Sequence, residues 1–166
     1  MHLRPEVPSD AAAVHEINVA AFGRDEEARL VALLREQARP VVSLVAEEDG
    51  TLVGHVMFSP VALHRFTRLM MGLAPMAVTP ARQRRGIGSA LVRAGLDRCT
   101  DLGAAAIVVL GHPDFYPRFG FVPAALFGLA CEYDGPAEAF MATELVPGAL
   151  QGAAGTVSYH PAFAGL

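Results

Sequence analysis

The sequence contains no lysine, and its 13 long basic side chains are all arginines. The absence of lysine excludes the Gly-x-x-x-x-Gly-Lys-Ser/Thr phosphate loop of nucleotide hydrolases. Charge is sparse as well, because charged residues make up 18% of the chain and the formal net charge is −4. We therefore expect no basic nucleic-acid surface, and we find no acidic cluster suited to magnesium.

Cysteine is nearly absent too, with Cys99 and Cys131 the only two. Two thiols make neither a zinc site nor a disulfide framework, and they favour a reduced, cytoplasmic chain. The longest apolar runs, 104–110 and 122–131, fall far short of the ~20 residues that span a bilayer. Residues 1–6 show no apolar run behind a basic start. We expect a cytoplasmic protein that uses no metal and does not enter a membrane.

The remaining composition is that of a globular chain, and 166 residues suit a single domain, 1–166. Apolar periodicity predicts helices at 11–21, 26–38 and 86–102 and a short helical turn at 115–119. Extended apolar runs predict strands at 3–4, 41–46, 51–58, 69–78 and 105–110, with weaker signals at 139–146 and 156–159. This order predicts a mixed α/β sheet with one β-α-β crossover.

The most informative stretch is residues 78–91, where a strand ends and a helix begins. The start of a helix offers unpaired N–H groups and a partial positive charge, which together bind anions. Gly86 and Gly88 would let a pyrophosphate approach the backbone, and arginines cluster just before them. Paired glycines before a helix also occur for reasons of turn geometry alone. The Gly-x-Gly-x-x-Gly dinucleotide motif is incomplete, because Leu91 takes the place of its third glycine.

Three segments carry a resemblance to a known family. Residues 83–88, Gln-Arg-Arg-Gly-Ile-Gly, match the Gln/Arg-x-x-Gly-x-Gly/Ala signature of the GNAT superfamily of N-acetyltransferases. Residues 75–78 resemble the strand that enters that loop, and 116–121 are similar to the family's Tyr-x-x-x-Gly-Phe motif. The match covers about 1–125, and residues 26–31 and 110–113 resemble a YhbS-like branch. The remaining residues, 126–166, would be an extension belonging to that branch.

The resemblance implies the GNAT fold, a mixed and mostly antiparallel central sheet flanked by helices, with the acyl-CoA loop in its crossover. It also implies transfer of an acetyl group from acetyl-CoA, as cosubstrate, to a primary amine of a small molecule or peptide. A homodimer is possible, since dimers are common among relatives. The cofactor positions carried over are Met76, Ala77 and Val78 for the pantetheine arm, Gln83, Arg84, Arg85, Gly86, Ile87, Gly88 and Ser89 for the pyrophosphate, and Phe119.

Tyr116 is the candidate general acid. A phenol with a pKa near 10 stays protonated at neutral pH and can donate to a leaving thiolate. The alternative is a tyrosine that only packs at a helix end. The other two tyrosines, Tyr133 and Tyr159, lie in the extension.

The general base is less defined, because strand 69–78 lacks the glutamate that many relatives carry there. The candidate bases are Glu27 and His112, with Glu26 and His55 as further possibilities. Glu27 could instead be a solvated carboxylate favoured by its helix dipole, and His55 a hydrogen-bonded core histidine. His112 could serve the pocket or only a turn, and a water chain could replace any dedicated base.

Three functions fit these residues. The first is an active N-acetyltransferase, favoured by Tyr116 beside an intact phosphate loop. The second is a non-catalytic CoA-binding regulatory domain on the same fold, which the missing strand glutamate favours. The third is an unrelated nucleotide- or phosphate-binding protein, for which the sequence shows no base-recognition element.

Overall fold

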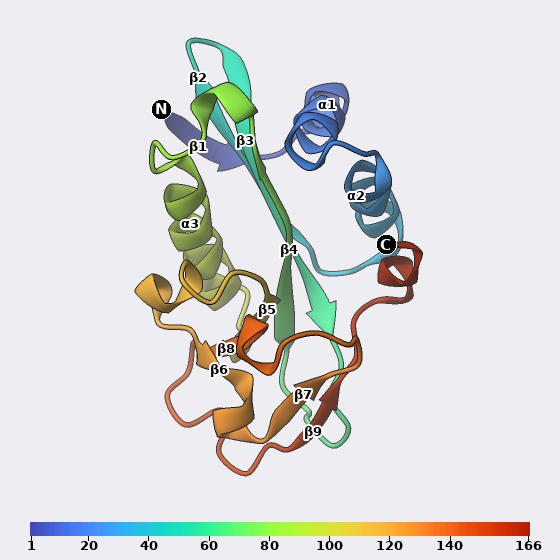
Figure 1. The fold of residues 1–166 in the computed structure, drawn as a ribbon, viewed down its shortest axis with the longest axis vertical. Helices are drawn as coiled ribbons and strands as arrows, with labels where there is room; N and C mark the ends of the chain where they lie inside the picture. Colours follow the sequence, from blue (N-terminus) through green and yellow to red (C-terminus); the bar gives the residue numbers. More distant parts are fainter.

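The computed structural model describes residues 1–166, which build a seven-stranded sheet with helices on both faces (Figure 1). The strand order is β1-β2-β3-β4-β5-β8-β6. These strands are β1 (His2–Pro5), β2 (Val42–Glu48), β3 (Thr51–Val61), β4 (Met70–Val78), β5 (Ala106–Leu110), β8 (Phe140–Glu144) and β6 (Val122–Pro123). Only the β4–β5 pair within this sheet is parallel.

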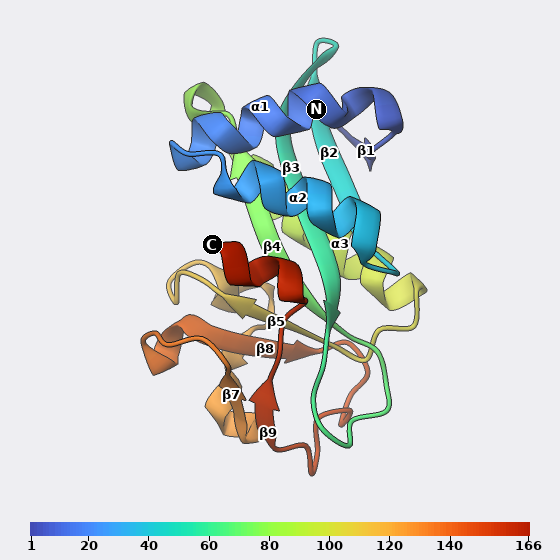
Figure 2. The same cartoon turned by 90° about the vertical axis from the view of Figure 1, so that its right-hand side faces the viewer.

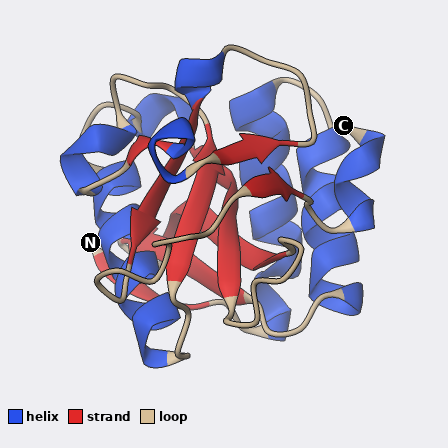
Figure 3. Ribbon diagram, turned by 90° about the horizontal axis from the view of Figure 1, so that it is seen from below, coloured by secondary structure: helices blue, strands red, loops and turns tan.

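Helices α1 (Ala11–Phe22) and α2 (Glu26–Gln37) lie on one face of the sheet, and α3 (Ile87–Asp101) lies on the other (Figures 1 and 2). The crossover from β4 through α3 to β5 is the predicted β-α-β unit, and it places the start of α3 at the carboxyl end of β4. Seen from below, the strands lie between helices on both sides (Figure 3). No helix is long and apolar enough to cross a bilayer.

Each face of the sheet has its own hydrophobic core. The core under α1 and α2 includes Val14, Leu34 and Met57, and the core under α3 includes Phe58, Leu91 and Ile107. Helix α3 lies especially close to β3 at Gly95, where an ideal Cβ would stand 2.1 Å from Cε1 of Phe58. Since no side chain fits in that space, glycine fixes how closely α3 approaches the sheet.

Two irregularities shape the middle of the sheet. In β3 the register against β2 shifts near Val53, and this residue packs under α3 while His55 and Met57 face α1 and α2. Regular alternation along this strand would put Val53 on the same face as His55, but a β-bulge breaks the alternation and puts Val53 on the opposite face. In β4 the register shifts between Met76 and Leu73.

Strands β4 and β5 pair over only three positions, and the last of these joins Gly72 to Val108. Beyond Gly72, β4 continues to Val78 with β3 as its only neighbour. One edge of β4 is therefore free over residues 73–78. We call the space between this edge and the end of β5 the β4–β5 gap.

The chain beyond residue 125 contributes to the sheet, because β8 lies between β5 and β6. The rest forms a small parallel pair, β7 (Leu129–Cys131) with β9 (Gly155–Val157), below the main sheet in Figure 2. A terminal 3₁₀ turn, Pro161–Gly165, packs against α2. The other 3₁₀ turns are Pro8–Asp10, Pro80–Arg82, Tyr116–Phe119, Ala124–Phe127 and Ala137–Ala139.

Candidate active site

The start of α3 has the features of an anion site. Gly86 is its N-cap residue and takes a left-handed conformation, φ 84°, and no side chain caps the helix. Arg84 is left-handed too, φ 63°. The backbone N–H groups from Arg84 through Ser89 donate to no carbonyl of the chain, because the next bond runs from Ala90 to Gly86. A row of free N–H groups at a helix start is suited to a pyrophosphate.

Side chains around this loop leave the N–H groups open. The side-chain amide of Gln83 donates to the carbonyl of Val78 at 3.0 Å, which ties the loop back to β4. Arg82 forms an ion pair with Glu48 at 3.2 Å, whereas Arg84 and Arg85 are exposed and form none. Ile87 is 2% exposed and packs at Gly54, so it offers the site only its backbone.

The free edge of β4 carries Met76, Ala77 and Val78. These residues pair with Val56, His55 and Gly54 of β3 on one side and with no strand on the other. Backbone groups along such an edge can hydrogen-bond an extended ligand as a further strand would. The pantetheine arm of CoA, with its two amides, has this shape and chemistry.

Three predicted segments meet at Gly88. An ideal Cβ on this residue would lie 3.5 Å from Cε of Met76 and 3.9 Å from Cζ of Phe115. The end of β4, the start of α3 and the turn that carries Tyr116 are therefore adjacent. Phe119 lies one turn further, with the guanidinium of Arg93 4.9 Å above its ring, and so packs on α3.

Tyr116 lies at the start of the turn Tyr116–Phe119 with its ring against Gly111. It is 7% exposed and surrounded by phenylalanine rings, of which Phe115 has its centroid 5.0 Å away and Phe121 5.6 Å. This burial raises the pKa of Tyr116 to about 12. The phenol therefore keeps its proton at neutral pH.

Glu27 is held by Arg24, a residue that the sequence analysis did not select. Nε of Arg24 lies 3.0 Å from Oε1 and its Nη2 2.6 Å from Oε2, and the Glu27 side chain is 8% exposed. The Glu27 hydrogen bond is also the main cause that raises the pKa of Arg24. Arg24 precedes Glu27 by three residues at a helix start, a spacing that could have indicated the pair.

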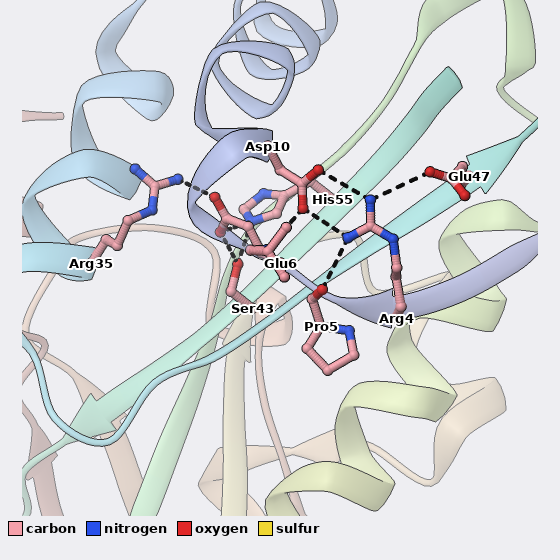
Figure 4. Close-up of polar contacts among 9 residues, drawn as sticks. Arg4, Pro5, Glu6, Asp10, Arg35, Ser43, Glu47 and His55 are labelled. Carbon is pink, nitrogen blue, oxygen red and sulfur yellow. Dashed lines mark hydrogen bonds and ion pairs between the residues drawn. The ribbon is translucent and has the colours of Figure 1, made fainter. Parts of the chain in front are cut away.

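His55 is a core residue, as one alternative for it predicted. Its Nε2 lies 2.9 Å from the hydroxyl of Ser43, which donates to Glu6, and Glu6 accepts from Arg35 (Figure 4). On the other side, Nδ1 lies 3.4 Å from the amide nitrogen of Asn18. Burial, with a smaller contribution from the charge of Arg35, lowers the pKa of His55 to about 3.

His112 lies at the carboxyl end of β5, exposed, with neither ring nitrogen bonded within the chain. Its carbonyl accepts from the N–H of Phe115 at 3.1 Å, so it belongs to the turn that carries Tyr116. Glu26 forms only a 3.5 Å ion pair with Arg24.

A cavity of about 610 Å³ lies elsewhere. It opens beside β2 between α2 and the far end of α3, where Arg35, Ser43 and Leu102 line it. None of the predicted cofactor or catalytic residues reaches it, so the candidate site is defined by the α3 start and the β4–β5 gap.

The chain is similar to several known proteins. Residues 11–121 match the model of the acetyltransferase (GNAT) family. The chain is 40% identical over 164 residues to the uncharacterized N-acetyltransferase YhbS of Escherichia coli strain K12, with 98% of both chains covered.

Two crystal structures are similar over nearly the whole chain. The first, YhbS from Escherichia coli in complex with CoA, has a TM-score of 0.92 and 38% identity, and the match covers 98% of this chain and 91% of that one. The second, a GNAT family acetyltransferase from Brucella melitensis in complex with acetyl-CoA, has a TM-score of 0.80 and 37% identity, with 98% and 97% covered.

Proposed function

The chain belongs to the acetyltransferase (GNAT) family, and on that premise we propose how its residues move an acetyl group from acetyl-CoA to an amine. It is an acetyl-CoA-dependent N-acetyltransferase, and solved relatives hold CoA or acetyl-CoA. The observation that carries the residue assignment is the row of free N–H groups from Arg84 through Ser89 beside an unpaired strand edge.

The pyrophosphate of the cosubstrate binds these N–H groups, with Gly86 and Gly88 leaving room for it. The pantetheine arm runs along the free edge of β4 at Met76, Ala77 and Val78. A backbone N–H of Ala77 or Val78 then faces the thioester oxygen. One such donor to a developing oxyanion is commonly worth about 3 kcal/mol.

The neutral amine attacks the thioester carbonyl and forms a carbon–nitrogen bond, and the negative charge moves to the carbonyl oxygen. The amine gives a proton to His112, and the carbonyl re-forms as the carbon–sulfur bond breaks. The CoA thiolate takes a proton from Tyr116, and the resulting phenolate regains a proton from solvent. A phenol whose pKa is raised to about 12 is protonated at neutral pH and can hydrogen-bond the thiolate as it forms. Because that pKa makes it a weaker acid than a thiol, the transfer is completed only when the phenolate regains its proton. The protein supplies position and hydrogen bonds for the rest of the reaction.

We assign the proton-accepting role to His112 rather than Glu27. Arg24 occupies both carboxylate oxygens of Glu27, so that side chain fixes the α1–α2 corner. His112 is free on both ring nitrogens and shares the turn of Tyr116.

A reducing compartment such as the cytoplasm suits the two unpaired cysteines, Cys99 and Cys131. We also propose that the chain forms a homodimer, and light scattering, which measures the mass in solution, tests this.

Calorimetric titration with CoA, ATP and NAD tests the cosubstrate, and CoA release with a panel of amines tests the reaction. We expect binding of CoA alone and amine-dependent release of CoA. Equal binding of all three nucleotides would contradict the site assignment. CoA binding without release for any amine would favour the non-catalytic regulatory domain.

A further inference from the structure

The cavity of about 610 Å³ beside β2 has no part in the mechanism given above. Its volume is in the range of small-molecule sites in proteins. It lies where the edge strand β1 ends, because Pro5 pairs with Leu44 while β2 itself starts two residues earlier, at Val42. The cavity therefore reaches around an uncovered edge of β2, with α2 on one face of the sheet and α3 on the other.

Several walls of this cavity are apolar. Val42 and Leu44 of β2 line it, and so do Val7 and Leu102. Val7 is 46% exposed and Leu102 is 47% exposed. Apolar side chains that are half exposed beside a concave surface leave water when a ligand covers them, and this stabilises the complex. The cavity therefore favours a ligand that carries an apolar group.

Two of the charged residues that line the cavity already satisfy each other. Glu6 accepts hydrogen bonds from Arg35 and from Ser43, and its side chain is 7% exposed (Figure 4). The pair of Arg35 with Glu6 adds no net charge to the cavity. A ligand that displaced either partner would leave the other charge uncompensated, which is unfavourable for a mostly buried group. The charged groups of a ligand must therefore bind elsewhere in the cavity.

The remaining charges of the cavity belong to the last turn of α3. Arg98 and Asp101 both line the cavity and are exposed, and neither takes part in an ion pair. Their spacing of three residues lets opposite charges on a helix pair, yet these two do not. Helix α3 ends at Asp101, and the negative end of its dipole adds to the attraction of this carboxylate for a cation. One cationic and one anionic group are thus both available to a ligand.

We propose that this cavity binds an α-amino acid with a large apolar side chain. The carboxylate of the ligand binds the guanidinium of Arg98, its ammonium group binds Asp101, and its side chain covers Leu102 and the edge of β2. A ligand with a charge of only one sign would leave Arg98 or Asp101 without a partner, whereas a zwitterion matches both.

This site is separate from the one that holds the cosubstrate. Helix α3 has 15 residues, and its start binds the pyrophosphate while its last turn lines the cavity. At about 1.5 Å per residue, the two ends of the helix are about 20 Å apart. The inference therefore does not depend on the proposed function, and the site can be studied with CoA bound.

Calorimetric titration of the CoA-saturated protein with L-phenylalanine tests the ligand class. Three further probes each lack one group: 3-phenylpropanoate lacks the ammonium group, 2-phenylethylamine lacks the carboxylate, and glycine lacks the side chain. We expect L-phenylalanine to bind about tenfold more tightly than each of these probes, because each loses one charge-assisted bond or the apolar contact. No binding of L-phenylalanine, or equal binding of either probe with a single charge, overturns the inference.

Variants show whether the ligand binds in this cavity. Arg98→Gln removes the preference for L-phenylalanine over 2-phenylethylamine, and Asp101→Asn removes the preference over 3-phenylpropanoate. The matched controls are Arg68→Gln and Asp97→Asn, because both residues are exposed and neither lines the cavity. These controls keep the wild-type affinity, and all four variants keep the wild-type thermal midpoint because the replaced side chains are exposed. Binding of L-phenylalanine that neither Arg98→Gln nor Asp101→Asn weakens would place the ligand outside the cavity and refute the inference.

Discussion

Nε2 of His55 lies 2.9 Å from the hydroxyl of Ser43, and the bonds around this contact fix the protonation of the imidazole (Figure 4). Ser43 donates its own hydrogen to Glu6, so its oxygen accepts from His55. The amide nitrogen of Asn18 faces Nδ1, which must then be the acceptor. His55 is therefore neutral, with its proton on Nε2, even though Glu6 lies 3.8 Å away. Arg35 already neutralises that carboxylate, and full burial disfavours a second cation.

This assignment predicts how stability depends on pH. The pKa of His55 falls from 6.5 in the unfolded chain to about 3 in the folded one. A lowered folded pKa gives a contribution to stability that is complete above pH 6.5 and is lost as the pH falls toward 3. The loss is about 1.4 kcal/mol per pH unit.

The measurement is the free energy of unfolding by urea from pH 7 to pH 4. We expect His55→Gln to flatten this dependence, because an amide can donate to Ser43 and accept from Asn18 without titrating. The exposed His64→Gln serves as control and keeps the wild-type slope. Identical slopes for all three proteins would show that His55 is not a buried neutral base.

Replacement of Tyr116 by phenylalanine tests the proton donor. The ring keeps its contacts with Phe115 and Phe121, so the fold and the CoA affinity stay as they are. Turnover falls by on the order of 10²-fold, the usual contribution of a general acid. Because burial holds the pKa of Tyr116 at about 12, wild-type kcat shows no alkaline loss from this group up to pH 10. Unchanged turnover in Tyr116→Phe would remove the phenol from the mechanism.

Variants of His112 and Glu27 test which of the two side chains accepts the proton of the amine. His112→Gln lowers kcat about tenfold or more, with the thermal midpoint preserved because the side chain is exposed. Glu27→Gln breaks the pair with Arg24 and lowers the thermal midpoint instead. If Glu27→Gln alone lowers kcat, and does so at full stability, the assignment is reversed.

The sequence predicts the three helices well, because residues 11–21, 26–38 and 86–102 show a clear apolar periodicity and residues that start or end helices. The phosphate loop is equally local, since Gly86 and the helix that follows it are continuous in sequence. The position of residues 139–146 in the sheet could not be predicted, because their place between β5 and β6 depends on pairing with residues that are distant in the sequence. Tyr159 was hidden for the same reason: its closeness to Gly72 follows from the fold and from no pattern.

Substitution of Gly86 tests the anion site itself. Gly86→Glu puts a carboxylate at the N–H groups that bind the pyrophosphate, and we expect CoA binding to disappear in calorimetry. Because the left-handed conformation also strains any side chain, Gly103→Glu is the matched control. Gly103 has φ 86° against 84° for Gly86, and neither has a heavy atom within 4 Å of an ideal Cβ. Gly103→Glu binds CoA normally, and full affinity in Gly86→Glu would mean that the phosphate binds elsewhere.

The packing of α3 against β3 decides whether its free N–H groups point into the gap. At Gly95 an added methyl would stand 2.1 Å from Cε1 of Phe58, so Gly95→Ala forces the helix and the ring apart. We expect a loss of about 1–3 kcal/mol in the free energy of unfolding and weaker CoA binding, both restored by a second change, Phe58→Leu. Gly88→Ala is the control within the same helix for stability alone, because its added methyl meets Met76 at an ordinary 3.5 Å but lies in the proposed pyrophosphate site. Helix propensity favours alanine over glycine by about 1 kcal/mol, so Gly88→Ala keeps or gains stability. If Gly95→Ala proves as stable as Gly88→Ala, then α3 is not held against Phe58, and the position of the phosphate-binding helix start has another cause.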